Sequence, residues 1–352
     1  MADDDLFFNM DDDDDELLAS CLREEAEKAK KESEMRRYRE ITKGTDVTPE
    51  ELYTYYHARK RRSKYKKLTE QQLYKRIKTM CRENNIPEEL DIYIVSALME
   101  IFRKDTVRPI LLIGNPGCGK TYLAKVVADV AGLGFHQISA PGAGVGRGLT
   151  GDSKTYRSSK YGELVSAIVN TESRNPVVLI DEIDKDSRKR ENDHSITNEL
   201  LSALDGSRRV YDNFLQEMVD TSGIIFILTA NSEELIPEWL IDRCCKIFFP
   251  VPTKDRIVSI VRRYIAGVID TGKCDGRVSI PDEVMDYLVN SLYDKGVRSI
   301  RQYQSLAETA CDIAYCTMMD AEQSHIVVTE AMIDDARKEF MKHRHRGIGF
   351  AS

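Results

Sequence analysis

A short apolar run that leads directly into a glycine-rich loop constrains this 352-residue chain more than any other feature. The run, Ile110 to Ile113, has the length of a buried strand. The loop, Gly114 to Thr121, fits the pattern G-x4-G-K-S/T, and a segment with helical apolar spacing begins at Leu123. Strand, loop and helix in this order predict a phosphate-binding loop, whose glycines let successive N–H groups point at an anion near the positive end of a helix dipole.

This loop predicts a binding site for a nucleoside triphosphate with a magnesium ion. We expect Lys120 to meet the β- and γ-phosphates and the Thr121 hydroxyl to bind Mg²⁺. The alternative is a glycine-rich turn that binds no nucleotide, but such a turn does not require a strand before it and a helix after it. The residues expected to contact the nucleotide are Gly114, Asn115, Pro116, Gly117, Cys118, Gly119, Lys120, Thr121, Tyr122 and Asp181.

Polar side chains also follow two other apolar runs. Val177 to Ile180 ends at Asp181 and Glu182, and Ile224 to Thr229 is followed closely by Asn231. Charges at the carboxyl end of a buried parallel strand face the crevice in which phosphates bind. We therefore expect Asp181 to support the Mg²⁺ shell and Glu182 to polarise an attacking water. The amide of Asn231 is expected to orient that water or to contact the γ-phosphate.

The region from Pro109 to Pro252 alternates between predicted strands and helices, which is typical of a parallel sheet covered on both faces. The predicted strands are Ile110–Ile113, Phe135–Ser139, Val177–Ile180, Ile224–Thr229 and Lys246–Phe249. After Thr253 we expect only helices, at Lys254–Ile269, Pro281–Leu292, Val297–Met318 and Glu330–His343, with Ser279 and Thr329 as caps. The fold class is therefore α/β, with a nucleotide-binding subdomain at residues 87–252, a helical lid at 253–346 and a tail at 347–352.

The N-terminal part differs in charge from the rest. The chain has a net charge of −8. Residues 1–16 alone carry nine negative charges and contain no Lys or Arg, so the rest of the chain is nearly neutral. We expect residues 1–16 to be a disordered acidic tail whose apolar centre, Leu6 to Met10, either docks on a partner or is solvated. Residues 17–86 are expected to be helical, with Thr48 and Thr69 as helix caps and a further helix from Pro87 to Phe102.

A cluster of cations lies between Arg59 and Lys67, with Tyr65 among them. Such a cluster is typical of a surface that binds nucleic acid. It is equally compatible with a solvated helix face or with a contact to the acidic tail. The sequence leaves these three alternatives open.

The composition argues against a membrane protein and against a zinc site. No apolar run reaches 18 residues and the N-terminus is acidic, which predicts neither a membrane span nor a signal peptide. The eight cysteines lack the paired spacing of zinc ligands, so we expect reduced thiols. These features together predict a cytoplasmic protein.

Five motifs, in this order, resemble those of the AAA+ ATPases: GNPGCGKT, VVLIDEID, FILTAN, IDR and GVRSIR. Within this family the chain looks like the ATPase module of Lon proteases. The segment from Tyr211 to Asn231 is similar almost residue by residue to the Lon segment that leads into its sensor asparagine. The resemblance extends from about Pro87 to His343.

The resemblance implies roles for individual residues. Lys120 and Thr121 match the Walker A motif, and Asp181 and Glu182 match the Walker B motif. Three further matches are Asn231 with sensor 1, Arg243 with the arginine finger offered to the neighbouring subunit, and Arg298 with sensor 2 in the lid. Tyr156 matches the pore-loop aromatic that grips an unfolded polypeptide. A homo-oligomeric ring, with six subunits expected, is also implied.

The sequence departs from Lon in three places. Lon carries a peptidase domain after its lid, whereas this sequence ends at Ser352, so we expect no peptidase activity. The large substrate-recognition domain of Lon is replaced by a short acidic and helical region. Next to Tyr156 stands Arg157, where Lon usually has an apolar residue.

Three functions are therefore considered. We expect an ATP-hydrolysing ring motor that remodels or unfolds a protein, as a chaperone does. The alternatives are a DNA-associated motor or loader that uses Arg59–Lys67, and a nucleotide-gated scaffold without catalysis. The presence of Glu182 disfavours the scaffold.

Overall fold

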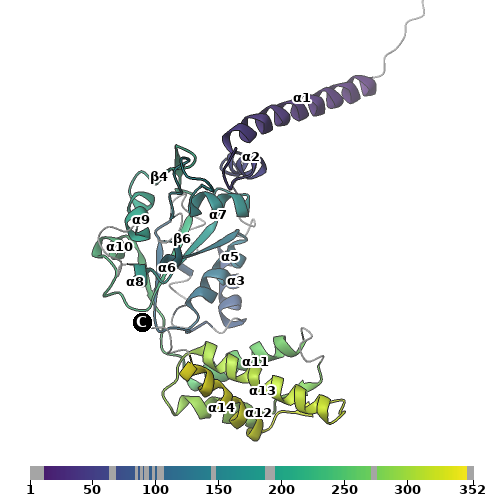
Figure 1. Cartoon of the computed structure of the whole chain (residues 1–352), viewed down its shortest axis with the longest axis vertical. Coiled ribbons are helices and arrows are strands. Elements are labelled where there is room, and N and C mark those ends of the chain that lie inside the picture. The colour runs from purple at the N-terminus through teal and green to yellow at the C-terminus, as the bar shows by residue number, and fades with distance from the viewer. Residues whose placement is uncertain are drawn as a thin grey trace, which may run out of the picture.

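Three parts follow one another along the long axis of the molecule (Figure 1). In this computed structural model, the described residues are 12–62, 69–83, 86, 87, 90, 95, 96, 100, 107–143, 148–186, 195–270 and 276–346. Two N-terminal helices lie at one end, an α/β core in the middle and a helical lid at the other end. The predicted helix from Pro87 to Phe102 falls largely outside the described residues, as do residues 1–11 and 347–352.

The core contains a parallel sheet of five strands in the order β2-β3-β6-β1-β7. The strands are β1 (Ile110–Ile113), β2 (Phe135–Ser139), β3 (Val177–Asp181), β6 (Ile225–Ala230) and β7 (Cys245–Phe248). All five were predicted, each to within one residue at either end. The parallel α/β fold class expected from the sequence is thus confirmed, and the carboxyl ends of β1, β3 and β6 meet at one edge.

Helices cover both faces of this sheet, which explains why its strands are apolar on both sides. Ile110 and Leu112 pack toward α3 (Glu70–Glu83) and α5 (Lys120–Ala131). Leu111 and Ile113 pack on the other face, toward α7 (Glu163–Thr171) and α9 (Ile196–Leu204). Each such side chain, when fully buried, contributes about 1.5–3 kcal/mol. Shorter helices complete the core: α6 (Ala140–Ala143), α8 (Ile183–Asp186) and α10 (Glu238–Arg243).

A β-hairpin that the sequence analysis missed lies outside the main sheet. It pairs β4 (Arg209–Asp212) with β5 (Glu217–Asp220) in antiparallel register. Val210 and Val219 are opposite each other and buried, whereas their neighbours along each strand point outward except Asp212. The strands have only four residues each, too few for their alternation to stand out from a loop.

In the described residues of the lid, 253–270 and 276–346, there are four helices and one small β element. The helices are α11 (Lys254–Asp270), α12 (Asp282–Tyr293), α13 (Ile300–Asp320) and α14 (Glu330–Arg346). The expectation of helices alone was wrong, because β8 (Val278–Ser279) pairs in parallel with β9 (Ile326–Val327). Ser279 therefore belongs to a strand, and Pro281 occupies the N-cap position of α12. The other predicted cap is confirmed, since Thr329 Oγ1 accepts the Met332 N–H at 3.4 Å.

The helices of the N-terminal region, residues 17–86, pack at two different places on the core. The first, α1 (Asp12–Ile41), extends away from the core, and α2 (Pro49–Ala58) packs on α7 and the β4–β5 hairpin (Figure 1). By contrast, α3 packs against α5. Helix α1 begins at Asp12, so its first residues overlap the segment 1–16 that was expected to be a disordered tail. Within the described residues, no helix has the length and apolar character needed to cross a membrane.

Candidate functional site

The glycine-rich loop lies between β1 and α5 and holds the ammonium group of Lys120 at its centre. Lys120 Nζ donates to Gly114 O at 2.6 Å, to Asn115 O at 3.1 Å and to Asn231 Oδ1 at 3.1 Å. The side chain is almost fully buried, and this burial lowers the pKa of the Lys120 ammonium. Contact with Asn231 brings together two residues that were predicted to share the site.

The loop is shaped by backbone that a side chain could not easily replace. Gly117 has φ +74°, and a Cβ there would lie 2.3 Å from the Ser299 hydroxyl. The Gly117 carbonyl accepts the Ile300 N–H at 3.0 Å, so the first turn of α13 rests directly on the loop. Cys118 is buried beside them, and burial raises the pKa of its thiol. The lid and the phosphate-binding loop are thus in hydrogen-bonded contact.

Asp181, the last residue of β3, collects hydroxyl and amide donors from three other elements. It accepts the Thr121 hydroxyl at 3.2 Å and the Gln137 amide at 3.2 Å, and it also accepts the Thr229 hydroxyl. A hydroxyl and a carboxylate held this close are the hard oxygen ligands that Mg²⁺ prefers. Together with the Lys120 ammonium and the loop N–H groups, the donor set fits a magnesium nucleotide.

Glu182 follows Asp181 in an unusual backbone conformation. Its φ is +59°, in the left-handed region that residues other than glycine seldom adopt. The Glu182 N–H donates to Thr229 Oγ1 at 3.0 Å, which holds the backbone in place. The carboxylate forms an ion pair with Lys185 Nζ at 2.5 Å. Such strained backbone is concentrated at functional sites, which agrees with the predicted catalytic position.

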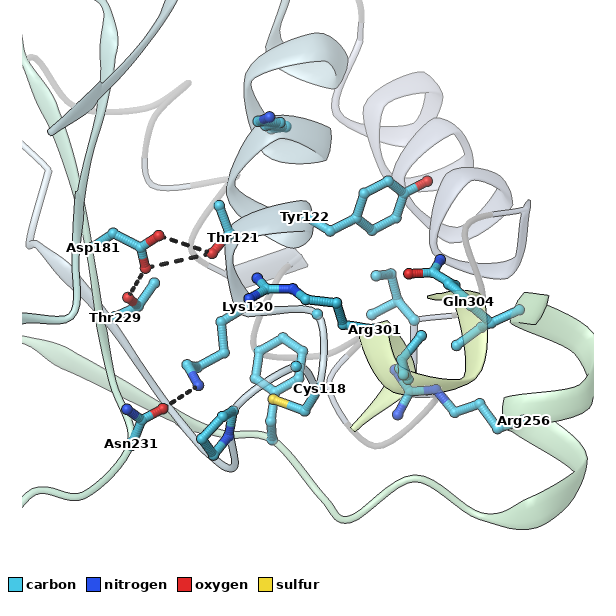
Figure 2. A pocket seen from close by; sticks show the side chains of 18 of the residues that line it. Cys118, Lys120, Thr121, Tyr122, Asp181, Thr229, Asn231, Arg256, Arg301 and Gln304 are labelled. Atoms are coloured by element: carbon cyan, nitrogen blue, oxygen red, sulfur yellow. Dashed lines mark hydrogen bonds between the residues drawn. The ribbon is translucent and has the colours of Figure 1, made fainter. Parts of the chain in front are cut away.

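A cavity of about 440 Å³ separates this edge of the sheet from the lid. Figure 2 shows the phosphate-binding loop on one side and side chains of α11 and α13 on the other. The lid contributes Arg256, Arg301 and Gln304, among others, while apolar side chains such as Phe249 and Ile260 line another part. A volume of this size with a few convergent polar groups is typical of a small-molecule site.

A model of the family described as "ATPase family associated with various cellular activities (AAA)" matches residues 110–251. Residues 110–251 are therefore similar to a AAA ATPase domain and are called the AAA core below. It is 36% identical over 211 residues to "Lon protease homolog, mitochondrial 1" of Dictyostelium discoideum and 34% identical over 184 residues to "Lon protease" of Nitrosococcus oceani. These matches cover 58% and 51% of this chain but 22% and 24% of the relatives, so the chain spans about a quarter of their length. The predicted resemblance to the ATPase module of Lon is confirmed.

Among solved structures, a mutant of RuvB from Thermotoga maritima aligns with a TM-score of 0.49 and 17% identity. The alignment covers 71% of this chain and 68% of that chain.

Of the two arginines in the motif GVRSIR, Arg301 lines this cavity, whereas the role expected for Arg298 stays a prediction. Arg298 Nη1 donates to the carbonyls of Tyr293 and Val297, each at 2.8 Å, and its guanidinium lies 3.7 Å from the Tyr293 ring centre. Arg298 is not among the residues that line the cavity, whereas Arg301 is. In Figure 2 the Arg301 side chain extends toward Lys120. The reason is local, because α13 begins at Ile300 and Arg298 precedes its first turn.

Arg243 lies at the end of α10, away from this cavity. It is exposed, donates to Trp239 O at 2.8 Å and stacks over the Trp239 ring at 5.5 Å. This position is compatible with a role toward another subunit, which stays a prediction.

Tyr156 lies on a loop at the end of the AAA core that also contacts α2. Its side chain is 69% exposed. The base of the loop is closed by the Asp152 N–H, which donates to Lys160 O at 3.0 Å. Gly151 and Gly162 approach so closely that a Cβ on Gly162 would lie 2.7 Å from the Gly151 nitrogen. The loop therefore presents an aromatic side chain from a narrow, fixed base.

The cation cluster is partly engaged by the protein itself. Arg59 Nη1 donates to Glu217 Oε1 of the hairpin at 2.6 Å, and its guanidinium lies 5.0 Å from the Tyr56 ring centre. Arg61 lies 3.9 Å from Glu172. Residues 63–67 of the cluster lie outside the described residues. Arg59 thus connects α2 to the core, which weakens its assignment to nucleic acid.

Several residues at the nucleotide site were not singled out from the sequence. Gln137 and Thr229 both contact Asp181, and Arg256 of α11 faces the loop. A polar residue near the carboxyl end of an apolar strand was a usable signal for Thr229. Nothing in the local sequence of α11 distinguished Arg256 from its other cations.

Proposed function

We propose that this chain hydrolyses ATP and uses that energy to remodel or unfold a polypeptide, acting as one subunit of a ring. Hydrolysis is supported by three groups at the carboxyl edge of the sheet: the Lys120 ammonium, the Thr121–Asp181 pair and the Glu182 carboxylate. The relatives match this chain over their AAA region, which supports ATP rather than peptide bonds as the substrate of these residues. Its cytoplasmic location remains a prediction.

At this edge, some side chains bind the nucleotide and another accepts a proton. Lys120 and the loop N–H groups bind the β- and γ-phosphates, and Thr121 with Asp181 would hold Mg²⁺, which when bound neutralises charge on the phosphate oxygens. The Glu182 carboxylate accepts a proton from the attacking water, and the Asn231 amide orients that water. The Glu182 carboxylate is paired with Lys185 Nζ, so it has to leave that lysine before it can contact the attacking water.

Coupling of hydrolysis to movement is supported by the contact between loop and lid. The Ile300 N–H donates to the Gly117 carbonyl, and Arg301 enters the cavity from the same helix. A change in phosphate charge within the cavity therefore acts on α13 through Arg301. Arg243 is exposed at the end of α10, where it is available to a neighbouring subunit, and we expect six subunits in the ring.

The proposal that this chain remodels a polypeptide is supported by one observation: Tyr156 is exposed on a loop with a fixed base. An aromatic side chain held away from its own protein can grip an extended polypeptide without reading its sequence. The alternative, a DNA motor, would need phosphate contacts. Arg59, its first candidate, is paired with Glu217.

The test compares ATPase stimulation by an unfolded protein and by duplex DNA, at low and moderate salt. Tyr156→Ala should reduce the ratio of protein-stimulated to basal ATPase to near unity. Tyr74→Ala is the matched control, because Tyr74 is also exposed but lies on α3. Neutralising Lys60 and Arg61 should leave the ratio within about twofold.

The opposite result would favour the DNA motor. Stimulation by DNA alone should then weaken with salt, because the affinity for duplex DNA falls by roughly 0.9 log units per phosphate contact for each log unit of salt. If that stimulation is lost with Lys60 and Arg61 and is indifferent to Tyr156, the protein-remodelling proposal is wrong.

A further inference from the structure

Helix α2 contacts one limb of the loop that carries Tyr156, through the carboxylate of Glu51. Glu51 Oε1 accepts the Tyr161 hydroxyl at 3.0 Å and lies 3.1 Å from Lys160 Nζ. The backbone adds a third contact, in which the Asp46 N–H donates to Ser159 O at 3.2 Å. The side chains of Glu51 and Lys160 are only about a quarter exposed, so their attraction is partly shielded from water.

The same carboxylate is fixed by the start of its own helix. Glu51 Oε2 accepts the Thr48 N–H at 2.7 Å, and Thr48 Oγ1 accepts the Glu51 N–H at 3.2 Å, which completes a capping box. Leu52 and Tyr55 of α2 are buried in a cluster with Tyr161 and Phe214. Glu51 therefore has a single orientation, with one oxygen on the helix and the other on the loop.

The opposite limb of the loop is held by Asn213, in the turn of the β4–β5 hairpin. The Asn213 N–H donates to Thr150 O at 2.7 Å, and its side-chain amide donates to Gly151 O at 3.0 Å. These hairpin residues lie within the AAA match at residues 110–251, whereas α2 lies outside it. The hairpin thus contacts both limbs, since Asp212 Oδ2 also accepts the Gly162 N–H at 2.8 Å, and the N-terminal helix contacts only the limb of residues 158–162.

We propose that Glu51 is a positioning residue for the Tyr156 loop, so that α2, from outside the AAA core, determines how firmly the loop grips polypeptide. This inference rests on the polypeptide grip proposed above. Without the Glu51 charge, the limb of residues 158–162 keeps its buried Tyr161 ring but loses its ion pair. The tip then fluctuates more, and ATP-driven movement of the core is transmitted less well to Tyr156.

The experiment uses the full chain with Glu51→Gln. Glutamine also completes a capping box, so α2 remains capped, but its amide N–H₂ then faces the Lys160 ammonium. Glu50→Gln is the matched control, because Glu50 is an exposed carboxylate in the same helical turn. Two quantities are measured beside the thermal midpoint: the rate of tryptic cleavage after the exposed Arg157, and the ratio of protein-stimulated to basal ATPase.

We expect Glu51→Gln to raise cleavage after Arg157 about 3- to 10-fold, the range that corresponds to one lost hydrogen-bonded pair. The stimulation ratio should fall by a similar factor, while Glu50→Gln matches wild type in both. A purely structural role would instead lower the thermal midpoint and reduce basal and stimulated rates together. Tyr161→Phe should reproduce part of the effect and add less than its full effect to Glu51→Gln.

Each contrary outcome has a distinct meaning. An unchanged cleavage rate in Glu51→Gln would show that Glu51 does not position the Tyr156 loop. If Glu51→Gln is cleaved faster but keeps the wild-type ratio of stimulated to basal ATPase, while Tyr156→Ala lowers that ratio, then positioning of the loop by Glu51 does not affect how Tyr156 grips polypeptide. If Tyr156→Ala itself leaves the ATPase ratio unchanged, the proposed polypeptide grip is wrong. The cleavage rate then still tests whether Glu51 positions the loop.

Discussion

The two ends of the AAA core are built in different ways. At the end that faces the lid, the side chains come from short continuous motifs, and Lys120, Asp181 and Asn231 meet because parallel strands end at one edge. At the other end, near α2 in Figure 1, the loop of Tyr156 is held by contacts between segments far apart in the chain, such as Glu51 with Tyr161. The nucleotide end is therefore specified locally, and the loop end is specified by packing.

This difference predicts different responses to mutation. A change at the nucleotide end should remove a chemical step while the fold stays intact. A change at the loop end should alter stability or coupling and leave the chemistry in place. Four substitution experiments test the distinction, the first with the largest expected effect.

Glu182→Gln should reduce ATP turnover by about 10²-fold or more, because positioned general-base catalysis supplies about that much. ATP binding should persist, since the loop and Lys120 are unchanged. Binding of a fluorescent ATP analogue and phosphate release measure the two separately. Lys120→Ala, in contrast, should lose binding as well. Turnover by Glu182→Gln at the wild-type rate would remove Glu182 from the mechanism.

Arg243→Ala should also be inactive, yet mixing it with Glu182→Gln protein should restore activity. In a ring with random mixing in equal amounts, about a quarter of interfaces pair an intact base with an intact arginine. Phosphate release is measured across mixing ratios, with mixed assembly confirmed by differently tagged subunits. Absence of recovery at every ratio would argue against an arginine that acts on a neighbouring subunit.

The same difference explains what the sequence could predict. All five strands of the main sheet and the phosphate-binding loop follow from apolar runs and turn residues that are adjacent in the chain. The β4–β5 hairpin was missed because its pairing is short, and the roles of Glu51 and Arg59 were missed because their partners are more than a hundred residues away. No local pattern encodes such contacts.

Asp212→Asn tests the loop end through stability. The Asp212 carboxylate is buried and accepts the N–H groups of Gly162 at 2.8 Å, Phe214 at 3.0 Å and Leu215 at 2.8 Å. Burial raises its pKa from 3.8 to about 6 despite these donors. The folded state therefore binds this proton more tightly than the unfolded state. Protonated Asp212 therefore adds to the free energy of unfolding. This contribution is full below about pH 4 and is lost as the pH rises to about 6, by on the order of 3 kcal/mol.

The asparagine variant should lack this pH dependence and should lose about 1–3 kcal/mol, because its N–H₂ group faces a backbone donor. Urea unfolding between pH 4 and 7 measures the difference between variant and wild type. Asp220→Asn, on the other hairpin strand, is exposed and serves as the control. A variant that keeps the wild-type pH dependence would show that Asp212 is not its source.

The smallest effect is expected where the local motif and the packing disagree. Arg298 and Arg301 both belong to the motif GVRSIR, and the family resemblance selects the first. Packing selects the second, because Arg298 is engaged with Tyr293 while Arg301 lines the cavity. Arg301→Ala should weaken ATP binding about tenfold, the value of one hydrogen bond to a charged group.

Arg298→Ala should change ATP binding by less than about twofold and should lower the free energy of unfolding by about 1 kcal/mol, since it removes a stacked cation. Equilibrium binding and thermal unfolding of both variants separate the two effects. The reverse pattern, with weaker binding in Arg298→Ala alone, would mean that the motif defines the lid arginine and that Arg298 leaves Tyr293 when ATP binds. The nucleotide end would then be specified locally throughout, and the contrast with the loop end would be complete.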